Sequence, residues 1–160
     1  MLNVHILCVG KLKEKFYLEA AAEYAKRLSG YCKLTVTELP EERLPDDPAR
    51  ARIDAALEKE GRTLLSRLAK GGRVAALCVE GELMSSEALA DKLRQWTVGG
   101  TSQLTLVIGG SYGLSPAVKA RADLRLSMSP MTFPHHLARV MVLEQLYRAF
   151  KINEGSSYHK

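Results

Sequence analysis

Five short apolar segments alternate along the chain with longer segments in which apolar residues recur every three or four positions. The short segments are rich in Val, Leu and Ile, and we predict strands at residues 3–10, 33–39, 73–81, 104–110 and 123–129. The third and fourth are nearly continuous apolar runs, which is typical of strands covered on both faces in a parallel sheet. The strands are therefore expected to lie between layers of helices.

The longer segments predict helices at residues 13–30, 48–70, 85–96, 115–122 and 133–152. Ser115 followed by Pro116 is a strong helix start, because the hydroxyl can cap the first turn and proline fits the first helical position. The order is roughly βαβαβαβαβα. It predicts an α/β fold with a mainly parallel sheet and helices on both faces, formed by residues 1–160 as a single domain.

Charge and cysteine content narrow the class of protein. The formal net charge of +5 permits a polyanionic partner such as RNA, although an ordinary basic protein would also carry it. The three cysteines include no CxxC pair, so we expect a reducing cytoplasm, no disulfide framework and no metal site. No apolar run approaches the roughly 20 residues that a membrane-spanning helix needs, so no membrane association is expected.

The stretch LTLVIGGSYGLSP, at residues 104–116, predicts a strand, a glycine-rich turn and a helix start. Its GGxxG spacing differs from the GxGxxG of dinucleotide-binding folds, and the P-loop triplet GK[ST] does not occur in the chain. Phosphate binding is therefore disfavoured. Either the glycines only permit a sharp turn, or they let a ligand approach bare backbone at the carboxyl end of a strand.

A second unusual loop, LSMSPMTFPHH at residues 126–136, separates the fifth strand from the last helix. It presents many backbone polar groups and few charges, which suits an uncharged heterocycle such as adenine better than a triphosphate. An ordinary connection is the alternative, but the loop is longer than a tight connection needs. The chain contains no HExxH motif of zinc proteases.

The last helix and the tail contain the remaining candidate functional residues. Residues 140–143 are apolar all round the helix, which predicts burial against the sheet and also against another subunit. Arg139 and Arg148 belong to its polar face, where they either form ion pairs or contact phosphate. In the tail, Tyr158 can stack on a base and His159 can bind phosphate or move a proton.

The motifs LCVEG, LVIGGSYGLSP, LSMSPMTFPHHLARVMVLEQLYRAFKI and the terminal YHK identify a family resemblance. In length and element order the chain closely resembles the RlmH-type 23S rRNA pseudouridine N3-methyltransferases, which belong to the SPOUT class of S-adenosylmethionine (SAM) enzymes. The resemblance implies methylation of N3 of a pseudouridine in the large-subunit ribosomal RNA of assembled ribosomes. It also implies a homodimer and a trefoil knot in the C-terminal part of the chain, which periodicity alone does not predict.

Carried onto this sequence, the resemblance implies a SAM pocket and a set of catalytic candidates. The pocket residues are Leu77, Gly109, Gly110, Met128, Ser129, Pro130, Met131, Thr132 and Phe133. The catalytic candidates are His135, Arg139, Tyr158 and His159. The tail of one subunit is expected to approach the cofactor of the other. Two alternatives stay open, namely a non-catalytic RNA- or ribosome-binding protein on this scaffold and a flavodoxin-like nucleotide-binding enzyme.

Overall fold

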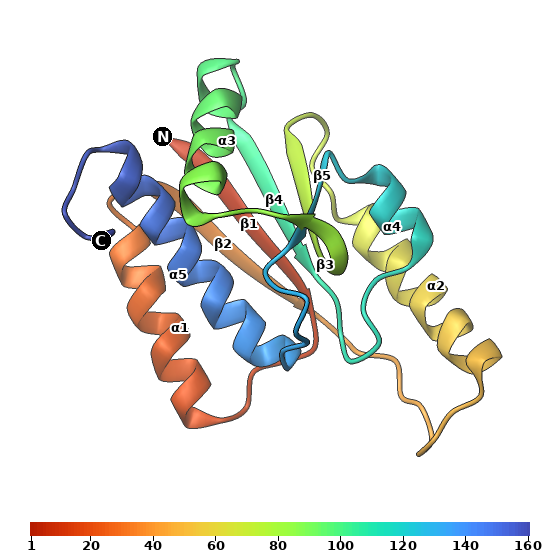
Figure 1. The fold of residues 1–160 in the computed structure, drawn as a ribbon. Coiled ribbons are helices and arrows are strands. Elements are labelled where there is room, and N and C mark those ends of the chain that lie inside the picture. The colour runs from red at the N-terminus through yellow and green to blue at the C-terminus, as the bar shows by residue number, and fades with distance from the viewer.

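The centre of the molecule is a five-stranded sheet in which every neighbouring pair of strands is parallel (Figure 1). The computed structural model describes residues 1–160. The strands are β1 (Leu2–Val9), β2 (Cys32–Leu39), β3 (Arg73–Leu83), β4 (Gln103–Ile108) and β5 (Leu124–Ser127), in the spatial order β2-β1-β4-β3-β5. The predicted α/β class with a parallel sheet is confirmed, and each predicted strand lies within a few residues of an observed one.

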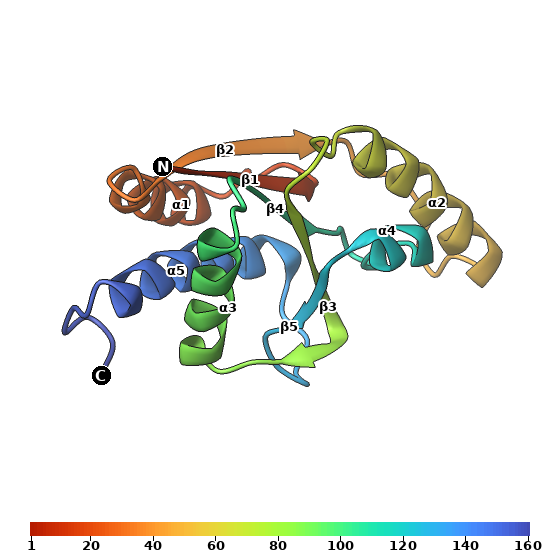
Figure 2. The same cartoon turned by 90° about the horizontal axis from the view of Figure 1, so that it is seen from above.

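Five helices cover the two faces of the sheet, so the prediction of helices on both sides is also confirmed (Figure 2). They are α1 (Lys15–Leu28), α2 (Arg50–Ser66), α3 (Ser86–Val98), α4 (Pro116–Arg121) and α5 (His135–Asn153). The predicted start of α4 is correct, because the Ser115 hydroxyl accepts a hydrogen bond from Val118 N–H and Pro116 is the first helical residue. None of these helices combines the length and the apolar character that spanning a membrane requires.

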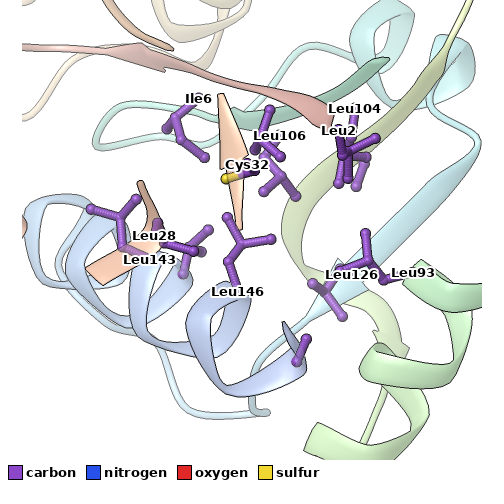
Figure 3. Packing of buried hydrophobic residues seen from close by; sticks show 14 of the residues in the cluster. Leu2, Ile6, Leu28, Cys32, Leu93, Leu104, Leu106, Leu126, Leu143 and Leu146 are labelled. Carbon is purple, nitrogen blue, oxygen red and sulfur yellow. The ribbon is translucent and has the colours of Figure 1, made fainter. Parts of the chain in front are cut away.

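The core consists of two hydrophobic clusters on opposite faces of the sheet. The larger cluster packs side chains of α1, α3 and α5, such as Leu143, against sheet side chains such as Ile6 and Leu106 (Figure 3). The smaller one joins α2 and α4 to the other face, through residues such as Leu7 and Val107. Successive residues of a strand therefore face different clusters, which explains why apolar residues stand next to one another in β1 and β4.

A β-bulge interrupts β3 where the sequence predicts a regular strand. Leu77 and Glu82 both pair with Leu126 of β5, so the residues between them bulge out of the ladder. Gly81 permits this path, because a β-carbon there would lie 2.7 Å from the carbonyl oxygen of Arg125. The bulge turns the segment from Cys78 to Glu80 toward the carboxyl ends of the neighbouring strands.

Candidate functional site

A cavity of about 730 Å³ lies at the carboxyl ends of β3, β4 and β5. Three segments from separate parts of the chain form its walls: the β3 bulge, the glycine loop after β4 and the loop between β5 and α5. The lining residues are Leu77–Glu80, Ile108–Leu114, Lys119, Met128, Ser129, Met131–His135 and Ala138. This is the edge at which open α/β sheets bind ligands.

The structure brings nearly all of the predicted cofactor residues together around this one cavity. Leu77, the two glycines Gly109 and Gly110, and most of the 128–133 loop line it. Pro130 is the exception, since it is exposed and does not line the cavity. Met131 is at the rim, with 72% of its surface exposed.

The glycine loop folds back on itself. Gly110 and Gly113 form an isolated antiparallel bridge, and Gly113 has a φ of 86°, in the left-handed region that favours glycine. A β-carbon on Gly109 would collide with the carbonyl group of Gly113, and one on Gly110 would lie 2.6 Å from Glu41 Oε1. The glycines therefore permit a tight turn, and they also line the cavity, where the approach of a ligand stays a prediction.

The loop between β5 and α5 is ordered by its serines. The Ser127 hydroxyl donates to the carbonyl oxygen of Ser129 at 3.1 Å, and the Ser129 hydroxyl accepts from Met131 N–H at 3.0 Å. These short-range bonds form an ST-type turn that exposes Pro130 and directs the following residues along the cavity.

Charged groups are few in the cavity wall. Glu80 and Lys119 form an ion pair, and the hydrogen bond from Lys119 holds the pKa of the Glu80 carboxyl below its usual value. Burial, followed by the charge of Glu80, raises the pKa of the Cys78 thiol, so this cysteine is protonated at neutral pH and is a poor nucleophile. The wall is thus mostly apolar side chain and backbone.

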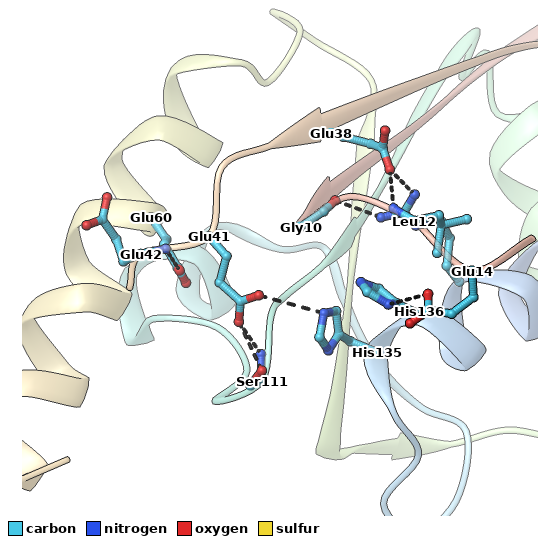
Figure 4. A network of polar contacts seen from close by, with 11 residues as sticks. Gly10, Leu12, Glu14, Glu38, Glu41, Glu42, Glu60, Ser111, His135 and His136 are labelled. Carbon is cyan, nitrogen blue, oxygen red and sulfur yellow. Dashed lines mark hydrogen bonds and ion pairs between the residues drawn. The ribbon is translucent and has the colours of Figure 1, made fainter. Parts of the chain in front are cut away.

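His135 begins α5 at the end of the cavity (Figure 4). Its Nε2 is buried without a hydrogen-bond partner and lies 3.9 Å from Glu41 Oε2. Burial and the neighbouring His136 lower the pKa of His135, so the imidazole is neutral at pH 7. A neutral imidazole at a cavity wall can accept a proton.

Arg139, a catalytic candidate, is a buried structural contact in this arrangement. Only 3% of the residue is exposed, and it does not line the cavity. Its guanidinium donates to Glu38 Oε2 at 2.6 Å and to the carbonyl oxygen of Gly10 at 2.9 Å. Glu38 also accepts from Leu12 N–H at 2.9 Å (Figure 4). The start of α5 is thereby tied to the ends of β1 and β2, and the guanidinium is not available to phosphate.

Tyr158 and His159 lie together against the C-terminal half of α5. The Tyr158 hydroxyl donates to Glu144 Oε1 at 3.3 Å, and Arg148 lies over the phenol ring at 4.9 Å from its centroid. His159 contacts Arg148 Nη1 at 3.0 Å and Glu87 Oε1 at 2.7 Å. At about 1.5 Å per residue, Arg148 is roughly 20 Å along the helix axis from His135. Within one chain the tail and the cavity are therefore separate.

Some residues at the site were not anticipated from the sequence. The wall also contains Cys78, Val79, Glu80, Ser111, Tyr112 and Lys119. Glycine after LCVE was the available signal for the bulge, because an isolated glycine in a strand often marks one. Lys119 carried no such signal, since its position depends on how α4 packs.

Known proteins resemble this chain over its whole length. The family model described as "Predicted SPOUT methyltransferase" matches residues 2–159. A protein of Levilactobacillus brevis named "Ribosomal RNA large subunit methyltransferase H" is 46% identical over 99% of this chain and 100% of its own length. A protein of the same name from Pelotomaculum thermopropionicum is 50% identical over 99% of both chains.

Solved structures share the fold at low sequence identity. A methylase-family protein from Haemophilus influenzae aligns with a TM-score of 0.54 and 15% identity over 99% of this chain and 71% of its own. A methyltransferase from Legionella pneumophila, solved with bound SAM, aligns with a TM-score of 0.51 and 14% identity over 93% and 66%. The full-length family match and the relatives at nearly half identity show that this chain belongs to the SPOUT methyltransferase family.

Proposed function

We propose that this protein transfers a methyl group from SAM to N3 of a pseudouridine in bacterial large-subunit ribosomal RNA. The observation that carries the proposal is a large cavity at the carboxyl ends of three parallel strands, in a chain 46% to 50% identical to proteins named ribosomal RNA large subunit methyltransferase H. Residues of LCVEG, LVIGGSYGLSP and the LSMSPMTFPHH loop form the cavity walls, whereas the terminal YHK lies apart from them.

The cavity fits SAM in size and chemistry. Its volume of about 730 Å³ lies within the range of roughly 300–1,000 Å³ usual for cofactor sites. Backbone of the glycine loop and of the 128–133 loop would hydrogen-bond adenine and ribose, while Leu77 and Met131 would contact apolar ligand surface. SAM supplies an activated methyl group when bound, so the protein contributes mainly alignment.

N3 of pseudouridine carries a proton that must be lost when the methyl group is transferred. His135 is the titratable side chain best placed to receive it, because it is neutral at pH 7 and lines the cavity. Tyr158 is a poorer base, since burial and the nearby Glu144 raise the pKa of its phenol. Tyr158 and His159 would instead position the RNA by stacking and hydrogen bonding.

The protein is proposed to act as a homodimer. The tail is separated from the cavity of its own chain by about half the length of α5, so a tail that contacts the cofactor would come from a second copy. The surface of α5 supports this arrangement, because Val140 and Met141 remain half-buried after α5 has packed on the sheet. The active site would then combine the cavity of one subunit with Tyr158 and His159 of the other.

The substrate is proposed to be assembled ribosome in the cytoplasm. The net charge of +5 favours a polyanionic partner. The shape of the particle would supply much of the recognition. Family membership also implies a trefoil knot in the C-terminal part, which would bring the three cavity walls together.

Methyl transfer to ribosomes tests the proposal directly. Ribosomes from a strain lacking the modification are incubated with radiolabelled SAM and the protein, and the labelled nucleoside is mapped by mass spectrometry. We expect label on a pseudouridine of the large subunit. No label with a folded, dimeric sample would refute the proposed activity. Calorimetry with S-adenosylhomocysteine (SAH) identifies the non-catalytic alternative, which would bind ribosomes but not SAH.

A further inference from the structure

Glu41 lies outside the cavity wall but contacts two residues that belong to it. It sits in the segment between β2 and α2, where the sequence predicted only a loop. We infer that Glu41 is a positioning residue of the methyl-transfer site: one carboxylate oxygen fixes the glycine loop and the other faces the imidazole of His135 (Figure 4). This inference rests on the proposed function.

The first half of the role is to hold the glycine loop. Glu41 Oε1 accepts hydrogen bonds from both the backbone N–H and the hydroxyl of Ser111, each at 3.0 Å. Gly110 leaves the space for this approach, because a β-carbon there would lie 2.6 Å from the same oxygen. Hydrogen bonds to an ionised acceptor are roughly twice as strong as neutral ones. These hydrogen bonds thus anchor one wall of the cavity to a residue that lies 70 positions earlier in the chain.

The second half of the role concerns the proton on His135. Its buried Nε2 has no hydrogen-bond partner, and Glu41 Oε2 at 3.9 Å is too distant for a hydrogen bond but near enough for a strong electrostatic interaction. A carboxylate opposite Nε2 favours the tautomer that carries its proton there. Nδ1 is then the nitrogen left free to accept a proton.

Charged groups from several elements face His135 and contribute to the pKa of its imidazole. His136 and Arg139 on α5 lower the pKa of the imidazole, whereas Glu41 and Glu14, which precedes α1, raise it. Burial is the largest influence and lowers the pKa. Of the two carboxylates, Glu41 acts more strongly on His135. Removing the charge of Glu41 should therefore lower the pKa of His135 further.

Two substitutions separate the two halves of the role. Glu41→Gln keeps an oxygen for Ser111 but places a neutral amide opposite His135. We expect SAH affinity within about threefold of wild type by calorimetry, with a lower His135 pKa and a changed tautomer by NMR of the ring. Glu41→Ala removes the acceptor from Ser111 as well. For this variant we expect SAH affinity to fall about tenfold, which corresponds to about 1.4 kcal/mol.

Glu42→Gln is the matched control, because this neighbouring carboxylate pairs with Lys59 at 3.3 Å and does not contact the cavity. Neither SAH affinity nor the titration of His135 should change in it. An unchanged His135 pKa and tautomer in Glu41→Gln would overturn the electrostatic half of the inference. Unchanged SAH affinity in Glu41→Ala, with a melting curve confirming that it is folded, would overturn the anchoring half.

The same measurements distinguish a failure of this inference from a failure of the proposed function. The titration of His135 is recorded on the free protein and needs neither cofactor nor RNA. If the wild-type protein failed to bind SAH, the proposed function would be refuted, while a Glu41-dependent His135 pKa would still support the contact that defines the positioning role.

Discussion

Replacing Arg139 by Met tests whether this residue acts through structure or through contact with the substrate. Methionine keeps much of the apolar stem and removes the guanidinium. The change leaves the Gly10 carbonyl without its donor and the Glu38 carboxylate without its cation. Because Arg139 is buried, stability should fall and α5 should lose its anchor to β1 and β2.

The size of the effect follows from the burial of the two partners. Breaking a buried ion pair by removing one member costs about 3–5 kcal/mol. The Arg139 side chain is 4% exposed, but Glu38 is 32% exposed and regains some hydration, so we take the lower end of that range. We expect the free energy of unfolding to fall by about 3 kcal/mol, or the melting temperature by about 6–12 °C for a chain of this size.

Urea denaturation followed by circular dichroism measures the change. Arg62→Met is the matched control, because its pair with Glu58 is exposed on both sides, 66% and 72%, and should contribute less than about 1 kcal/mol. A loss below about 1 kcal/mol in Arg139→Met would refute the buried-anchor reasoning. Abolished methyl transfer with unchanged stability and SAH binding would instead place Arg139 in contact with the substrate.

Three further outcomes are expected. Burial opposes the charge of Glu38, but hydrogen bonds from Arg139 and from the backbone N–H of Leu12 outweigh it and lower the Glu38 pKa. Its stabilising contribution is therefore present above the ordinary value of 4.5 and is lost as pH falls through the lowered folded pKa, so the stability gap between wild type and Arg139→Met should shrink in urea titrations below pH 4.5. Gly109→Ala should weaken SAH binding about tenfold or more in calorimetry, because the new β-carbon meets loop backbone that cannot rotate away; unchanged affinity would show that the loop can relax. Deleting residues 158–160 should lower methyl transfer to ribosomes more than SAH binding, and full activity of the truncated protein would remove the tail from the mechanism.

The glycine loop differs from a phosphate-binding loop in what its backbone N–H groups contact. A phosphate loop aims several backbone N–H groups at an anion near a helix start. Here the Glu41 carboxylate already accepts the N–H of Ser111, and the loop presents its glycines beside apolar side chains. The nearby carboxylate would repel a negatively charged ligand, whereas it would not repel an uncharged ring. The geometry therefore agrees with a SAM-type ligand.

The sequence by itself determined the class of fold and most of the cavity wall. The periods of apolar residues are local, and so are the Ser85 and Ser115 caps, so the elements could be predicted before any contact was known. The loops after β4 and β5 were recognisable because glycine and proline restrict or free the backbone at their own positions. Parallel strands then bring the ends of β3, β4 and β5 to one edge of the sheet.

Only the tertiary structure decided which side chains act together. The sequence leaves open whether Arg139 forms an ion pair or contacts phosphate, and only the fold brings it to its partner Glu38, 101 residues away, in a buried position. Glu41 lay in an unremarkable loop until packing placed it between Ser111 and His135. The bulge in β3 likewise depends on how Gly81 meets the backbone of β5. Local pattern cannot predict such pairs, because their energies arise from burial and charge between segments that meet only after the sheet has formed.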